Sequence, residues 1–93
     1  MNVPTATISR QINLPLTLEK LAHGDTAMVV AINVEAELKK RFFALGLKEG
    51  SHVRVLRKAQ FGGPMHLRVG TSELILRLKE ASCICLASSL NTA

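Results

Sequence analysis

In the stretch Leu45-Gly46-Leu47-Lys48-Glu49-Gly50-Ser51, a segment with helical periodicity gives way to one in which apolar residues alternate. Gly46 follows the last periodic apolar residue, where helices commonly need a left-handed backbone conformation. Gly50 and Ser51 predict a turn that leads into a strand beginning near His52. The stretch therefore predicts a joint between one helix and a small β-structure.

The segment before this joint predicts an amphipathic helix over residues 33–45. Asn33 can accept a hydrogen bond from a free backbone N–H of the first helical turn. Leu38, Phe42 and Leu45 lie on one helical face, which we expect to pack on a sheet. Two pairs of opposite charge stand four residues apart in the favourable order, Glu35 with Lys39 and Glu37 with Arg41.

Apolar residues also predict the strands around this helix. Residues 27–32 form an unbroken apolar run, which predicts a buried strand, and residues 17–21 predict a single helical turn before it. After the joint, alternation predicts four strands, over residues 52–55, 65–69, 74–78 and 83–87. The turn Phe61-Gly62-Gly63-Pro64 joins the first two of these, and we expect its two glycines to supply positive φ.

These elements favour a mainly β fold, a small SH3-like barrel of about five antiparallel strands with one inserted α-helix. Five short strands are too few for a two-sheet sandwich, and closure of a barrel removes exposed strand edges. We expect the barrel domain over residues 16–88, a loose polar arm over residues 1–15 and a flexible tail over residues 89–93. Apolar residues of the arm could still form a short edge strand, Ile8, Ile12 and Leu14.

The composition fits one globular domain with a basic surface. Of the 93 residues, 47% are hydrophobic, enough for one modest core, and the net charge of +5 suits an oppositely charged partner or a solvated surface. With no Trp or Tyr and three Phe, base stacking on single-stranded nucleic acid is disfavoured. No apolar run approaches the roughly 20 residues that cross a bilayer, so we expect a cytoplasmic protein without direct membrane insertion.

The sequence contains no recognisable catalytic arrangement. No glycine pair leads into a helix as in a phosphate-binding loop, and the acidic residues are scattered, so we expect a protein that is not an enzyme. Cys83 and Cys85 would share one face of a strand and could bind Fe²⁺ or Zn²⁺, with His52, His66 or His23 as further ligands. The alternatives are core packing for the cysteines and solvated positions for the histidines.

A basic face is predicted on the sheet. Arg54, Arg68 and Arg77 should lie on the non-apolar side of adjacent strands. Further cations stand at the strand ends, Arg57, Lys58 and Lys79. Such a surface could bind phosphates or an acidic protein, or it could remain solvated.

Several spaced motifs occur in order along residues 16–87. They are Leu18-X-X-Leu21-X-X-Gly24, then Leu45-Gly46-Leu47-X-X-Gly50-Ser51, Phe61-Gly62-Gly63-Pro64, Leu74-X-Leu76-Arg77, and Ala81 before the last strand. In this order they resemble the FeoA family of bacterial ferrous iron transport proteins. The resemblance implies an SH3-like barrel that is a cytoplasmic accessory to the FeoB-type membrane transporter, whose cytoplasmic part binds GTP. Similar domains also form the C-terminal module of iron-dependent repressors. This chain shows no helix-turn-helix segment, so the free-standing accessory protein fits better.

Read with this resemblance, the residues predict a docking module. At the helix end the candidates are Phe43, Leu45 and Leu47, and Phe43 lies off the predicted buried stripe, so it is either a second core contact or a partner contact. The other candidates lie in the turn and on the basic face, Phe61, Gly62, Gly63, Pro64, Arg54, Arg68 and Arg77. A regulatory module that binds Fe²⁺ or another transition ion is the alternative, and a nucleic-acid-binding barrel is the third hypothesis. An exposed strand edge or the arm could also support a homo-oligomer.

Overall fold

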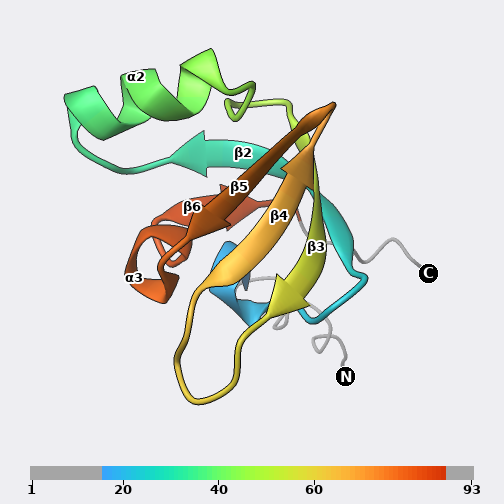
Figure 1. The fold of residues 1–93 in the computed structure, drawn as a ribbon. Coiled ribbons are helices and arrows are strands. Elements are labelled where there is room, and N and C mark those ends of the chain that lie inside the picture. The colour runs from blue at the N-terminus through green and yellow to red at the C-terminus, as the bar shows by residue number, and fades with distance from the viewer. Residues whose placement is uncertain (1–15, 88–93) are drawn as a thin grey trace, which may run out of the picture.

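Alternating apolar residues fold into one antiparallel sheet whose strands curve around a common core in the computed structural model, which describes residues 16–87 (Figure 1). The elements in chain order are β1 Leu16–Thr17, η2 Leu18–Lys20, β2 Thr26–Ile32, α2 Ala36–Ala44, β3 His52–Lys58, β4 Met65–Val69, β5 Ser72–Leu76, α3 Leu78–Ala81 and β6 Ile84–Leu86. The mainly β class is confirmed, and the two-residue β1 brings the sheet to six strands. The predicted arm and tail, with the edge strand expected in the arm, lie outside the described residues.

The strand order is β1-β6-β2-β3-β4-β5, so β1 and β5 lie at the two ends of the sheet. Within residues 16–87 no strand pairing joins these two, and the closure that was expected to remove every edge is not observed. The β5 strand therefore pairs with β4 on one side only.

The core forms on one face of the sheet, as the alternation predicts. Val53 and Val55 of β3 and Leu67 of β4 are buried, whereas Arg54 and Arg68 between them are exposed. The helical segments contribute to the same core through Leu18, Phe42 and Ala81. The single helical turn expected before β2 is confirmed as η2.

The β2 strand is only half buried, which corrects the expectation of a buried strand. Val29 and Ile32 lie in the core, but Met28 is 38% and Val30 is 48% exposed. The pairing with β6 shifts register between Val29 and Ala31. An unbroken apolar run does not distinguish a strand covered on one face from a strand covered on both, because both can be entirely apolar.

The α2 helix begins later than predicted. Its N-cap is Glu35 rather than Asn33, and the Asn33 side-chain amide instead donates to Cys85 Sγ at 3.7 Å. Neither predicted i,i+4 pair is among the ion pairs of the described residues, and Lys39 Nζ lies 3.5 Å from Glu49 Oε2 at the joint. No helix within residues 16–87 has the length and apolarity needed to span a membrane.

The predicted glycine termination of α2 is confirmed. Gly46 has φ of 93°, its N–H donates to the Phe43 carbonyl at 2.9 Å, and the Leu47 N–H donates to the Phe42 carbonyl at 2.9 Å. These two bonds are those of a Schellman motif, in which the residue after the glycine folds back on the last helical turn. Leu47 and Phe42 are accordingly both buried in the core.

Hydrogen bonds then attach the joint to β2. The Gly50 N–H donates to the Val29 carbonyl and the Val29 N–H donates to the Ser51 carbonyl, both at 2.8 Å. The Ser51 hydroxyl donates to the Gly46 carbonyl at 2.7 Å and accepts from the Lys48 N–H at 3.0 Å. The helix end and the start of β3 are thereby held in one fixed relation to β2.

Replacing Gly46 with alanine should destabilise the fold through the backbone alone. A Cβ at this position would meet nothing within 4 Å, so the cost comes from the positive φ and should be about 1–2 kcal/mol. Urea unfolding measures it. Gly46→Asn is the matched control and should lose less, because asparagine tolerates this conformation. Equal stability of wild type and Gly46→Ala would contradict the assignment.

Candidate functional site

The helix end presents two of the three apolar side chains predicted there. Phe43 is 63% and Leu45 is 44% exposed, whereas Leu47 is fully buried. Leu47 is removed from the docking candidates, because as the residue after Gly46 it turns inward onto Phe42. Leu45 does not complete the predicted buried stripe, because it is the C-cap and has left the helical period. Lys48 Nζ lies 5.8 Å from the centroid of the Phe43 ring, within the range of a cation–π contact.

The β3–β4 turn is built differently from the prediction. Phe61 and Gly62 carry the positive φ values, 56° and 81°, and the Gly63 N–H donates to the Gln60 carbonyl at 3.2 Å. Positive φ at both central residues is the pattern of a type I′ turn. Gly63 is required for a different reason, because a Cβ there would lie 2.5 Å from the Ala59 Cβ. The ring of Phe61 is 99% exposed at the tip of this turn.

Of the three arginines predicted on the basic face, Arg54 and Arg68 lie on strands of the sheet. Arg54 and Arg68 are direct neighbours across β3 and β4, an arrangement of like charges that is unfavourable on its own. Arg68 Nη2 lies 2.7 Å from Glu73 Oε2, and His66 Nε2 lies 2.9 Å from Glu73 Oε1. The hydrogen bond from Arg68, followed by that from His66, lowers the pKa of the Glu73 carboxyl below its usual range. Glu73 thus offsets part of the positive charge on the sheet.

Arg77 lies outside β5, which corrects its predicted place on that strand. The strand ends at Leu76, and Arg77 is the N-cap of α3. The Glu80 carboxylate accepts from the Arg77 backbone N–H at 3.1 Å, which begins a helix where a plain link was expected. Arg77 is therefore positioned beyond the end of β5, at the start of α3.

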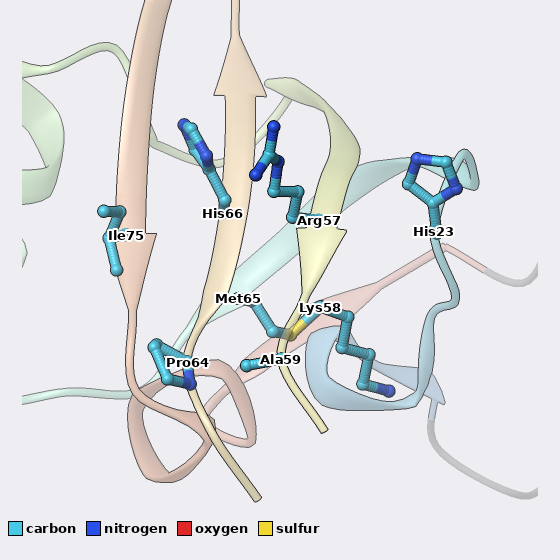
Figure 2. Close-up of a pocket in the computed structure, with 8 residues that line it drawn as sticks. All are labelled: His23, Arg57, Lys58, Ala59, Pro64, Met65, His66 and Ile75. Carbon is cyan, nitrogen blue, oxygen red and sulfur yellow. The ribbon is translucent and has the colours of Figure 1, made fainter. Parts of the chain in front are cut away.

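A shallow cavity of about 470 Å³ lies over β3, β4 and β5 (Figure 2). Arg57, His66 and Ile75 pair in one row across the three strands, and Figure 2 shows Arg57 between His66 and His23 in this view. Lys58, which also lines this cavity, donates to the carbonyls of Glu19 and Leu21 at 2.6 and 3.0 Å. This lysine therefore holds η2 in place rather than facing a ligand.

The predicted metal ligands do not converge. Cys83 precedes β6, and its thiol donates to the Lys79 carbonyl at 3.5 Å, so the two cysteines do not share a strand face. Both thiols are free and half-buried while Ile84 takes the core position, which also corrects the core-packing alternative. His52 at the start of β3 pairs with Met28. His66 pairs with Arg57 near the other end of β3, so the two histidines lie apart. Within residues 16–87 no group of three or more His, Cys, Asp and Glu side chains is placed to hold a metal ion.

A second, larger hollow of about 850 Å³ runs beside β5. Its lining comes from α2, the β3–β4 turn, β5 and α3, and consists of Arg41, Gly62, Pro64, Ile75, Arg77, Leu78, Lys79 and Glu80. Arg41 and Ile75 are not among the predicted site residues. The alternation of Leu74 and Leu76 places Ile75 on the outer face, but no local signal joins it to Arg41, because only the folded chain brings the two into one lining.

A family model and a known relative indicate one family. A family model described as the FeoA domain matches residues 16–88. A Campylobacter jejuni protein named Fe(2+) transport protein A is 29% identical over 69 residues, which cover 74% of this chain and 93% of that protein.

Solved structures of FeoA proteins are similar to this chain in fold. The solution structure of Chlorobium tepidum FeoA matches with a TM-score of 0.72 at 32% identity and covers 76% of this chain and 68% of that one. The crystal structure of Stenotrophomonas maltophilia FeoA, complexed with zinc and described as an SH3 domain protein, matches with a TM-score of 0.68 at 27% identity and covers 80% of this chain and 92% of that one. The predicted SH3-like fold is confirmed by this likeness.

Replacing Glu73 with glutamine should change how stability depends on pH. Because the folded state lowers the pKa of Glu73, its carboxylate stabilises the fold above the usual value of 4.5, and this contribution is lost as the pH falls through the lower folded pKa. Urea midpoints of wild type and Glu73→Gln should therefore differ at pH 7, and the difference should shrink as the pH falls below 4.5. Combining Glu73→Gln with Arg68→Gln should add little at pH 7. A wild-type advantage that does not decrease on acidification would contradict this role.

Proposed function

The chain belongs to the FeoA family of ferrous iron transport proteins, and we propose that it is a cytoplasmic accessory that docks on the GTP-binding part of a FeoB-type transporter and modulates iron uptake. The observation that carries this proposal is Phe43, an aromatic side chain 63% exposed at the end of α2. Large aromatic side chains that are accessible on a folded surface are typical anchors of protein interfaces.

The helix end supports such an anchor because it is preorganised. The Schellman bonds of Gly46 and Leu47 fix the backbone on which Phe43 and Leu45 are carried. Burial of Leu47 attaches this backbone to the core. Docking on a surface that is already ordered loses less conformational entropy than docking on a mobile loop.

The carboxyl groups with a shifted pKa among residues 16–87 belong to ion pairs on the surface. The two carboxyls with a shifted pKa, Glu49 and Glu73, are lowered by a backbone hydrogen bond and by an Arg68 hydrogen bond respectively. Both take part in ion pairs on the surface. An accessory role requires no reactive group, because it acts through binding alone.

Modulation then follows from differential binding. A GTP-binding domain exchanges between nucleotide-dependent conformations, and a protein that binds one of them more tightly shifts their populations by the ratio of its two affinities. In this proposal the helix end recognises one nucleotide state of the transporter. Equal affinity for both states would produce docking without modulation.

Truncating Phe43 should weaken binding to the full-length transporter in at least one nucleotide state. An anchor of this type contributes about 2 kcal/mol or more, so Phe43→Ala should lower the affinity about 30-fold, as measured by titration with GDP or a non-hydrolysable GTP analogue. Phe61→Ala also removes one exposed phenyl ring and tests the predicted docking candidate in the turn, and it should weaken binding less than Phe43→Ala does. Absence of wild-type binding in every nucleotide state would refute the docking function, whereas a loss only with Phe61→Ala would move the docking surface to the turn.

Transition-metal binding is the second candidate function, because the Stenotrophomonas maltophilia FeoA structure is complexed with zinc. In this chain the part that the structure describes offers no three-ligand group, so an ion would be held by one or two side chains with water completing its shell. The half-buried thiols of Cys83 and Cys85 are engaged with Lys79 and Asn33.

We expect weak Zn²⁺ and Fe²⁺ binding that does not depend on the cysteines. Equilibrium dialysis of wild type and the double variant Cys83→Ser/Cys85→Ser should give the same affinity, in the range of surface histidine sites. His52→Ala and His66→Ala test the two histidine candidates separately. Tight binding that disappears in the cysteine variant would show that the thiols rearrange to coordinate the ion.

A further inference from the structure

The free edge of β5 is the starting observation. β5 is the last strand of the sheet, and its pairing partner is β4 through the register Met65 with Leu76 to Val69 with Ser72. Among residues 16–87 no backbone hydrogen bond joins β5 to any other element. In an antiparallel pair alternate residues direct their backbone groups away from the partner, so β5 carries unpaired N–H and C=O groups along its outer edge.

The hollow beside this edge is positively charged. Arg41 from α2, Arg77 before α3 and Lys79 within α3 all line it. None of these three cations belongs to an ion pair among the described residues. Glu80 is the acidic residue of the lining. Its carboxylate accepts a hydrogen bond from the Arg77 backbone N–H at 3.1 Å, at the start of α3.

Apolar side chains accompany the cations. Ile75 is 68% exposed on β5, and Leu78 and Pro64 line the same hollow. Figure 1 shows α3 directly beyond the C-terminal end of β5, and the hollow there is lined both by Ile75 of the strand and by the cations. Natural proteins usually protect an edge strand with charges on the strand, bulges or cover. On β5 the charged side chain is Glu73, which is paired with Arg68 and His66 of β4, and Ile75 stays exposed.

We propose that an extended acidic segment of a protein partner binds in this hollow, pairs with the free edge of β5 and places its carboxylates at Arg41, Arg77 and Lys79. Backbone pairing supplies the orientation of the segment, as in other cases of strand addition, and Ile75 receives one of its apolar side chains. The three cations select against basic segments, which would meet uncompensated like charge. The inference rests on the proposed function in one respect, since the segment is assigned to the same transporter that the helix end recognises.

Two capped hexapeptides test the proposal on the full chain, one alternating Glu with Val and the other alternating Lys with Val. We expect saturable binding of the Glu-Val peptide, with the backbone amides of Glu73 and Ile75 shifting in two-dimensional NMR spectra, and at least tenfold weaker binding of the Lys-Val peptide. The triple variant Arg41→Gln/Arg77→Gln/Lys79→Gln should weaken the Glu-Val peptide at least tenfold. The matched control Lys20→Gln/Lys40→Gln/Lys48→Gln, which loses the same charge outside the lining of the hollow, should change it less than threefold. A Glu-Val peptide methylated on alternate backbone nitrogens should lose binding.

Several outcomes would overturn the inference. These are absence of Glu-Val peptide binding, binding that shifts no β5 amide, and equal weakening by the two triple variants. Equally tight binding of single-stranded oligothymidylate would identify a general anion surface. If the β5 amides respond only in a variant that lacks residues 1–15, the occupant of the edge is the chain's own arm. If the peptides do not bind but the transporter still binds in a Phe43-dependent manner, this inference alone fails. If the peptides bind but the transporter does not, the docking function fails.

Discussion

The inward turn of Leu47 onto Phe42 is the contact on which the other features of this domain depend. It requires the left-handed backbone of Gly46, which redirects the chain, and it buries the residue immediately after the helix. The turn that follows is bonded to β2 through Val29 and closed by Ser51. A single local reversal thus determines where α2 lies, where β3 begins and which residues remain on the surface at the helix end.

This arrangement leaves two accessible surfaces built on rigid elements. One is the helix end, where Phe43 and Leu45 project from a backbone fixed by its own termination. The other is the free edge of β5 with Ile75 and the cations that face it. In the proposal, both surfaces recognise another protein. A docking domain with two surfaces can hold its partner in one orientation, whereas a single anchor leaves rotation free.

Local sequence rules predicted the parts of the fold that depend on neighbouring residues. The glycine termination, the alternation of β3 and β4 and the position of Phe43 off the buried stripe all follow from spacing along the chain. Spacing left open whether Phe43 would be a second core contact or an exposed side chain, and the fold leaves it exposed. The rest depends on tertiary contacts that spacing does not encode. Leu47 is buried because the folded chain places the hydrophobic core beside the helix end. The β2 strand is half exposed because it lies between β6 and β3 with one face uncovered. Arg77 leaves the strand because the Glu80 carboxylate starts a helix, and the β5 hollow combines residues of four elements.

The central claim is that this domain recognises the transporter through surfaces held by the Gly46 reversal. Amide hydrogen exchange of the full chain, free and bound to the full-length transporter, tests it most directly. The account predicts slower exchange on binding at two places, residues 42–48 around the helix end and residues 72–77 along β5, with little change in β3. Slower exchange confined to β3 and the β3–β4 turn, with residues 42–48 unchanged, would contradict it.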